Sequence, residues 1–171
     1  MKKEKREKKK NGNKEIFKFV FLFISFSLFF YLIYYLLMDT LFFMRNATAA
    51  ILGFVFSLCG METVVDGASI RLNGFSFEII DECTAIFSSI VYCACIIAYP
   101  ANLKKKSIGI FIGIPSLYAL NLFRLFVLGL VGVFYPNMLG YIHIYLWQAT
   151  FIIFVVLIFL LWVNMVVSAG A

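Results

Sequence analysis

Four apolar stretches of the sequence are each long enough to cross a lipid bilayer as a helix, and this feature limits the fold more than any other. They lie at residues 16–38, 84–101, 107–134 and 142–167. A bilayer core of about 30 Å takes about 20 helical residues. Because 63% of the residues are hydrophobic, more than a soluble domain normally contains, the surplus apolar surface needs lipid to face. The sequence therefore predicts an all-α polytopic membrane protein.

A fifth apolar stretch, at residues 47–61, is shorter and decides the topology. As a helix it would reach only about 22 Å. Two basic clusters are expected on the cytoplasmic side: residues 1–15, with eight Lys or Arg against three Glu, and residues 104–106, which are all Lys. Both clusters lie inside only if the short helix is re-entrant or interfacial. We therefore predict four crossings, with both termini cytoplasmic.

The N-terminal segment and the remainder of the chain are expected to behave differently. Residues 1–15 have no apolar side chain after Met1, which predicts a disordered basic tail attracted to anionic lipid. Nucleic-acid binding by this tail is not expected, because aromatic or Gly-rich companions are missing. The apolar run that follows is too long for a signal peptide and has no cleavage site. Residues 16–171 are expected to form a single membrane-embedded domain.

A polar segment between the short helix and the second span has the pattern of a β-hairpin. Apolar and polar residues alternate on both sides of Asn73-Gly74 within residues 68–79. This pattern predicts two strands joined by a two-residue type I′ turn, and Asp66-Gly67 marks a turn before them. On the predicted topology the hairpin lies on the outer face.

Three residues from separate spans are predicted to meet at this outer face. Cys83 begins the second span and His143 opens the fourth. Arg124 lies 17 residues above the cytoplasmic start of the third span, which corresponds to about 26 Å of helix. Because the orientation was derived from the basic clusters alone, the agreement of these three levels supports it independently.

Each of these residues also has a structural interpretation. Cysteines are commonly inert packing residues, which suits Cys59, Cys93 and Cys95. A helix N-terminus favours the thiolate of Cys83, whereas the preceding acidic residues, Glu82 among them, oppose it.

Arg124 is an anchor at the interface if its side chain extends to the lipid headgroups. However, its neighbours are apolar, and charge inside a membrane usually serves a function. Asn121, on the same helix face, is expected to hold the guanidinium by a hydrogen bond. His143 lies among aromatic residues, so a role in an aromatic belt is the alternative.

Together the three residue types suit acyl transfer. A thiolate attacks a carbonyl, a base or acid moves the proton, and a fixed cation stabilises the oxyanion. The sequence has no HExxH motif, no Gly-rich phosphate loop and no CxxC pair with a nearby His. We therefore expect no metal and no cofactor.

These motifs resemble those of the exosortase/archaeosortase family. The similarity covers residues 45–150 and rests on Glu82-Cys83-Thr84-Ala85-Ile86-Phe87-Ser88 at the head of a span, Asn121-Leu122-Phe123-Arg124, and His143 opening the last span. Members are polytopic membrane cysteine enzymes of bacteria and archaea, similar to transpeptidases, that process proteins bearing a C-terminal sorting signal. Such a signal is a short motif, a membrane helix and a basic cluster. The family commonly has Gly where this chain has Ala85, and many relatives have more membrane segments.

The resemblance implies a role for each site residue. Cys83 would be the nucleophile that forms a thioacyl intermediate, Arg124 would stabilise the oxyanion or position the substrate, and His143 would be the general acid/base. Asn121 and Glu82 would support them. The active site would lie on the extracytoplasmic side of a prokaryotic cell membrane.

Two further hypotheses remain open at this stage. The hairpin would bind an extended sorting motif by adding it as a strand. The alternative function is a non-catalytic transport or assembly subunit, in which Arg124 and His143 bind an anionic ligand or lipid.

Overall fold

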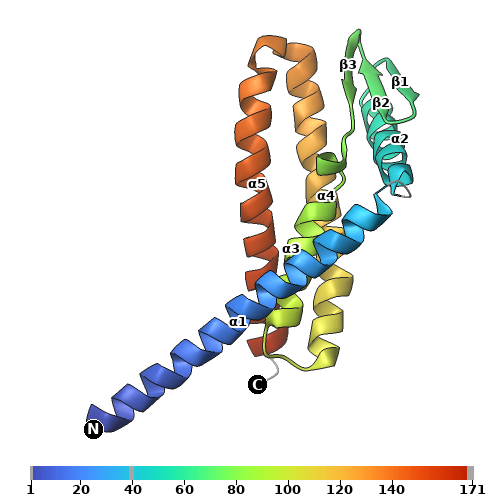
Figure 1. Cartoon of the computed structure of the whole chain (residues 1–171). Coiled ribbons are helices and arrows are strands. Elements are labelled where there is room, and N and C mark those ends of the chain that lie inside the picture. The colour runs from blue at the N-terminus through green and yellow to red at the C-terminus, as the bar shows by residue number, and fades with distance from the viewer. Residues whose placement is uncertain (1, 39–40, 169–171) are drawn as a thin grey trace.

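The computed structural model describes the backbone of residues 2–38 and 41–168, with their side chains except those of residues 2–12, 143–144 and 146–148. The helices are α1 (Lys2–Leu37), α2 (Phe42–Leu58), α3 (Ile86–Ala98), α4 (Leu103–Phe134) and α5 (Leu139–Trp162). The strands are β1 (Thr63–Asp66), β2 (Ser69–Leu72) and β3 (Phe75–Glu78) (Figure 1). Short 3-10 turns η1 (Asp81–Cys83) and η2 (Pro136–Met138) precede α3 and α5, and a π-helical turn η3 (Val163–Ser168) follows α5.

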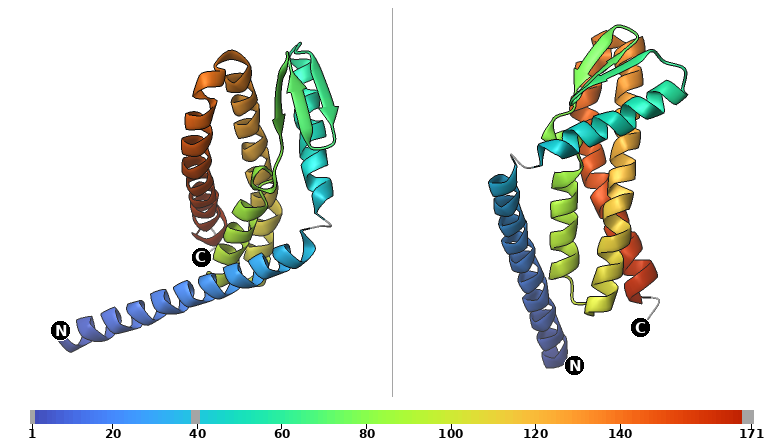
Figure 2. Two further views of the ribbon diagram at one scale, coloured as in Figure 1. Left: turned by 45° about the horizontal axis from the view of Figure 1, so that its top comes forward. Right: turned by 90° about the vertical axis from the view of Figure 1, so that its right-hand side faces the viewer.

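Helices α3, α4 and α5 pack side by side, and α1 crosses α3 obliquely (Figures 1 and 2). The glycines of α4 allow this close approach, because the ring of Tyr92 in α3 occupies the space that a Cβ on Gly113 would take. The Tyr92 hydroxyl also donates a hydrogen bond to the Gly109 carbonyl at 3.0 Å. From α5, Trp162 Nε1 donates to the Lys105 carbonyl at 2.8 Å. These contacts join the three helices at the end that carries the lysine cluster.

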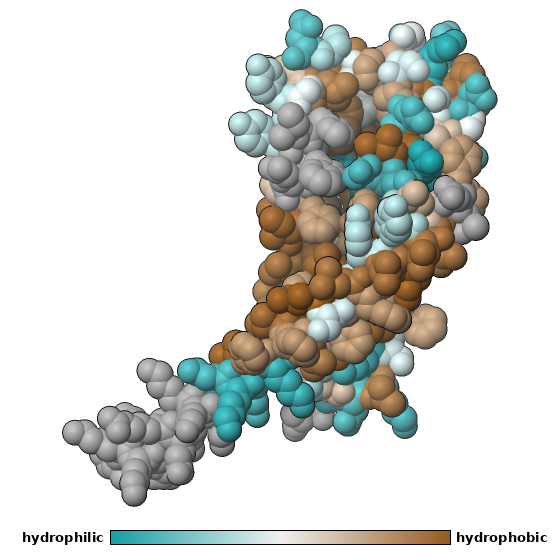
Figure 3. All heavy atoms as spheres, viewed as in Figure 1, coloured by the Kyte–Doolittle hydropathy of each residue, from teal (hydrophilic) through white to brown (hydrophobic). Residues whose placement is uncertain are grey.

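The predicted fold class is confirmed. Among the described residues, three helical stretches are long and apolar enough to cross a membrane: Asn13–Leu37, Leu103–Phe134 and Ala149–Ser168. In the space-filling view an apolar belt separates a polar region around the sheet from a polar region at the opposite end (Figure 3). This surface is typical of a chain whose middle faces lipid.

The second predicted span, residues 84–101, is corrected by the structure. Its helix, α3, has only 13 residues, about 20 Å in length, and falls short of a bilayer core. It starts late because Ala85 is left-handed, and it ends where Tyr99 turns extended before Pro100. Helices α1, α4 and α5 lie around α3, so this short helix is largely covered by protein (Figure 2).

The structure also extends the first helix. Helix α1 begins at Lys2, so the backbone of the segment expected to be disordered continues the helix. Lys and Glu are strong helix formers, and a helix propagates more readily than it nucleates. The division of the chain at residue 15 and the cytoplasmic place of the tail stay predictions.

The predicted hairpin is confirmed as β2 and β3. Leu72 and Phe75 face each other across Asn73 and Gly74, whose φ angles are 46° and 88°, the positive values that a type I′ turn needs. The sequence pattern missed strand β1, which pairs with β2 to give an antiparallel sheet of order β1-β2-β3.

Helix α2 lies across the other helices at the sheet end of the bundle (Figure 2). A buried cluster joins it to the sheet and to α4; its members are Ala49, Leu52, Phe56, Ile70, Leu72, Ile79, Cys83, Leu125 and Leu128. Cys83 belongs to this cluster because β3 leads directly into η1. The sheet and α2 therefore fix the position of the turn that carries Cys83.

Candidate functional site

Cys83 ends a tightly bonded 3-10 turn. Its N–H donates to the Ile80 carbonyl at 2.9 Å, and the Thr84 N–H donates to the Asp81 carbonyl at 3.1 Å. The Thr84 hydroxyl donates to the same Asp81 oxygen at 2.6 Å. Only 5% of Cys83 is exposed, so the thiol is held in one place away from bulk water.

Ala85 connects this turn to α3 in a left-handed conformation, with φ 62° and ψ 8°. This left-handed conformation costs a residue with a Cβ about 1–2 kcal/mol. The Ala85 carbonyl accepts bonds from the Ser88 hydroxyl at 2.9 Å and the Ser89 N–H at 3.0 Å. The bend at Ala85 separates Cys83 from the first turn of α3, so the thiol does not lie in the helix's own N-terminal turn.

Asn121 contacts the backbone of the cysteine. Its Nδ2 donates to the Cys83 carbonyl at 2.6 Å, and the residue is 7% exposed. This bond links α4 to the Cys83 turn. The bond forms because η1 lies against α4, within reach of the Asn121 amide. The expected bond to the Arg124 guanidinium would use the other amide atom, Oδ1, and stays a prediction.

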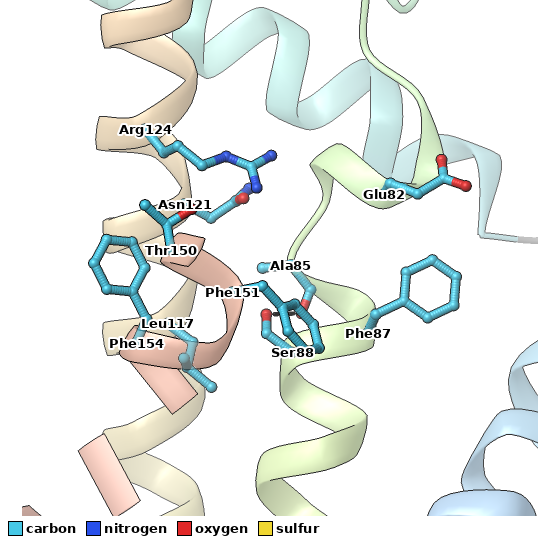
Figure 4. A pocket seen from close by; sticks show the side chains of 10 residues that line it. All are labelled: Glu82, Ala85, Phe87, Ser88, Leu117, Asn121, Arg124, Thr150, Phe151 and Phe154. Carbon is cyan, nitrogen blue, oxygen red and sulfur yellow. Dashed lines mark hydrogen bonds between the residues drawn. The ribbon is translucent and has the colours of Figure 1, made fainter. Parts of the chain in front are cut away.

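Arg124 is buried, with an exposed fraction of 5%. Its side chain extends from α4 toward the segment that joins η1 to α3 (Figure 4). Burial raises the pKa of the Cys83 thiol above its usual value, and the positive charge of nearby Arg124 opposes this effect. Glu82 adds a smaller increase to the Cys83 pKa. The two residues predicted to meet from separate helices are thus close enough to interact.

The Arg124 guanidinium has unused donors. Within the part of the chain that the structure describes, Nε and Nη2 have no hydrogen-bond partner. A buried charged group without full hydrogen bonding is costly, and in native proteins it commonly indicates a missing ligand or water. The arrangement is therefore suited to donate hydrogen bonds to an oxygen atom of a bound molecule.

A small cavity of about 20 Å³ adjoins Arg124, which is enough for one water molecule. It is lined by Glu82, Ala85, Phe87, Ser88, Leu117, Asn121, Arg124, Thr150, Phe151 and Phe154. Glu82 is exposed, and its carboxylate points away from Arg124 (Figure 4).

A second cavity, of about 220 Å³, includes Cys83 in its wall. Its other walls are β3, the upper part of α4 and the first residues of α5, Leu139 and Gly140. Cys83 therefore has a polar environment formed by Asn121 and Arg124 and, next to it, an apolar space.

His143 lies in α5, but its side chain is outside the described part of the structure. Four residues before it, Leu139 lines the larger cavity, and seven residues after it, Thr150 lines the smaller one. From these spacings, helical periodicity predicts the same face of α5 for position 143.

A second set of polar contacts around Cys83 was missed by sequence reasoning. Asp81 forms an ion pair with Arg45 of α2, with Nε and Oδ1 3.2 Å apart, and accepts a hydrogen bond from the Tyr34 hydroxyl of α1 at 3.1 Å. The Tyr34 ring also packs edge-on against Phe87, with centroids 5.1 Å apart. Arg45 precedes the short apolar stretch and Asp81 precedes the second apolar span, but nothing in the sequence paired these two charges.

Comparison with known proteins identifies the family. No curated protein and no solved structure matches the chain. The sequence model of the transmembrane exosortases matches residues 13–163, which include every helix and strand around the site. The chain therefore belongs to the transmembrane exosortase family.

Proposed function

We propose that this membrane protein is a cysteine protease or transpeptidase that cleaves the C-terminal sorting signal of exported proteins through a thioester on Cys83. The family consists of membrane transpeptidases that sort proteins. The observation that carries the proposal is the junction of η1 with α4, where Asn121 bonds to Cys83 and a buried Arg124 lies beside the thiol.

The reaction would proceed in two balanced steps. Cys83 Sγ attacks the substrate carbonyl, the C–N bond breaks, and the thiol proton passes to the leaving amine. An acceptor, water or an amine, then attacks the thioester carbonyl. The bond from this carbonyl to Sγ breaks, and the proton of the acceptor passes to Sγ, which restores the Cys83 thiol. The cavity beside Arg124 has room for one water molecule as such an acceptor.

Arg124 is proposed to stabilise the oxyanion. Its Nε and Nη2 donors are unoccupied within the described structure, and a buried cation interacts strongly with developing negative charge. Asn121 fixes the carbonyl of the attacking residue, which orients Cys83 without contacting the substrate.

His143 is proposed as the general acid/base. A thiol whose pKa is raised by burial is mostly protonated near neutral pH, so the attack requires a base. Helical periodicity predicts that position 143 falls on the α5 face of Leu139 and Thr150, which line the two cavities. Glu82, with its exposed carboxylate, is proposed only as a supporting residue at the rim.

The partners and location follow from the same proposal. Substrates would carry a motif, a transmembrane helix and a basic cluster, and the basic N-terminal segment would contact anionic lipid. The enzyme would lie in a prokaryotic cell membrane with both termini in the cytoplasm and Cys83 toward the outside.

The alternative is a non-catalytic subunit in which Arg124 binds an anionic ligand or lipid. The unoccupied guanidinium donors favour this possibility as well. The two functions differ in their need for a thiol, because anion binding does not require Cys83.

The test is to express the chain with a sorting-signal protein encoded in the same genome and to follow processing of that protein. Cys83→Ala should lower the processing rate by at least about 1,000-fold, because the nucleophile is removed. Cys59→Ser, a change at an exposed cysteine, is the matched control and should process normally. Normal processing by Cys83→Ala at equal expression would exclude the enzyme and favour the anion-binding subunit.

A further inference from the structure

The cavity of about 220 Å³ beside Cys83 has the size and lining of a side-chain pocket. Pockets for small-molecule ligands usually measure about 300–1,000 Å³, so this one suits a single side chain better. Phe77, Leu125, Leu128 and Leu139 make its wall apolar.

We propose that this cavity binds an apolar side chain of the substrate, on the residue whose carbonyl Cys83 attacks, while the preceding substrate residues pair with the free edge of β3. This inference rests on the proposed function and specifies how its substrate is recognised.

The edge of β3 is open to another strand. The sheet order β1-β2-β3 leaves β3 with a neighbour on one side only. The Ile79 N–H donates to the Ala68 carbonyl at 2.8 Å, and hydrogen-bonded pairs alternate along an antiparallel ladder. The backbone groups of Ser76 and Glu78 therefore face away from β2. Neither N–H donates to a carbonyl outside the sheet within the described residues.

An added strand would point its side chains into the cavity at every second residue. Phe75 and Phe77 share the face of the sheet that packs on α4, where the Phe75 ring fills the space beside Gly132. Because side chains alternate across a sheet, one set from a strand beside β3 also lies on this face, above the cavity that Cys83 lines.

The direction of the substrate also follows from the geometry. Strand β3 runs from the α4–α5 loop end of the bundle toward η1 (Figure 1). In the proposed function the substrate enters the membrane as a helix after the cleaved bond, so the residues before that bond lead away from the membrane. Those residues would run along β3 in the same direction as β3 and reach Cys83 at its end.

The test uses the full-length chain in liposomes and a series of peptide chloromethyl ketones, which alkylate a thiol beside a bound carbonyl. The residue that carries the ketone is Gly, Val, Leu, Phe, Glu or Lys. Peptide mapping by mass spectrometry gives the alkylation rate of Cys83 for each. Leu or Phe should react at least about tenfold faster than Gly or Glu, because only these side chains fill the apolar space.

Two matched variants separate a pocket from a general preference for apolar reagents. Leu139→Ala widens the cavity and should move the preference at least about threefold from Leu toward Phe. Leu130→Ala removes the same atoms from a residue that packs on the same core without lining the cavity, and should leave the order unchanged. Equal rates for all side chains, or an order that Leu139→Ala does not alter, would overturn the pocket.

The β3 edge is tested by proline, which removes one backbone donor. Ser76→Pro should slow alkylation by the Leu reagent at least about fivefold, without changing the rate with iodoacetamide. Thr63→Pro, on the far edge strand β1, should change neither rate. Equal effects of the two prolines would exclude pairing with β3. If Cys83 resists every reagent, iodoacetamide at pH 9 included, while exposed Cys59 reacts, the proposed function itself fails.

Discussion

Ala85 has a left-handed backbone conformation that alanine rarely adopts. Its φ of 62° is unfavourable for a residue with a Cβ, and it precedes α3 rather than lying inside it. We therefore predict that Ala85→Gly stabilises the protein by about 0.5–1 kcal/mol, after allowance for the extra freedom of glycine in the unfolded chain. Thermal unfolding in detergent micelles should show a rise of about 2 °C.

The control for this prediction is the same substitution within a regular helix. Ala94 is fully buried in α3, where glycine costs about 1 kcal/mol through lost helix propensity. Ala94→Gly should therefore lower the unfolding temperature. A decrease with both variants would show that the left-handed conformation of Ala85 carries no strain.

Cys83 should titrate at a higher pH than an ordinary thiol. It lies outside the described helices that are long and apolar enough to span a membrane, and burial raises its pKa while the charge of Arg124 lowers it. A raised pKa means that the reactive thiolate forms only at higher pH. The iodoacetamide rate of Cys83 should therefore reach half its maximum above about pH 8.5, the usual thiol value. Arg124→Gln removes the opposing charge and should move this midpoint further upward; an unchanged or lower midpoint would contradict the contact.

The sequence predicted which polar residues meet but not which atoms they use. The sequence predicts that Cys83 and Arg124 lie at the same level, because the basic clusters set the orientation and the helical rise sets the height of Arg124. This prediction needs only helix length. The bond from Asn121 to the Cys83 carbonyl joins residues 38 positions apart and depends on how deeply η1 sits against α4. The left-handed Ala85 likewise follows from tertiary packing, since alanine by itself favours a right-handed helix.

At the scale of elements, Asp81 fastens the Cys83 turn to two helices. Arg45 of α2 and Tyr34 of α1 both contact its carboxylate. The ion pair is about a quarter exposed, so its contribution to stability is expected to be small. Its larger effect should be on the position of the turn.

We predict that Asp81→Ala lowers processing of the sorting-signal substrate by about tenfold and raises the iodoacetamide rate of Cys83, because a loosened turn exposes the thiol. Tyr34→Phe removes one of the two contacts and should have a smaller effect of the same kind. Asp66→Ala, at an exposed strand end, is the control. An unchanged or lower iodoacetamide rate of Cys83 would contradict the loosened turn, and an equal rise at partly buried Cys93 would indicate general unfolding instead.

Elements were predictable where a local pattern determines them. The Asn73-Gly74 turn fixes its own φ angles, so the hairpin was correctly predicted. Strand β1 has only four residues and no clear alternation of apolar and polar side chains. It forms because it pairs with β2 and packs on α2 beside Gly53. The length of α3 was overestimated because apolar composition does not reveal the left-handed Ala85 and the extended Tyr99 that bound this helix.

At the scale of the whole molecule, the lysine cluster and the Cys83 site lie at different levels of the bundle. Lys106 Nζ donates to the Ile97 carbonyl at the end of α3, and Lys105 Nζ donates to the Val167 carbonyl after α5. These bonds use two of the three lysines to satisfy helix ends, so the cluster is structural as well as a topology signal. The sheet and α2 occupy the opposite end (Figure 1).

The predicted orientation can be tested with native and introduced cysteines. Cys83 is too buried to report its side of the membrane through a bulky maleimide. Cys59, by contrast, is exposed at the sheet end of α2. A membrane-impermeant maleimide applied to intact cells should label Cys59, and the label should disappear in Cys59→Ser. Lys104→Cys in that background places a thiol in the opposite basic cluster and should react only after permeabilisation. The reverse pattern would put the sheet and Cys83 on the cytoplasmic side, away from the exported part of a substrate, and would contradict the proposed extracytoplasmic processing.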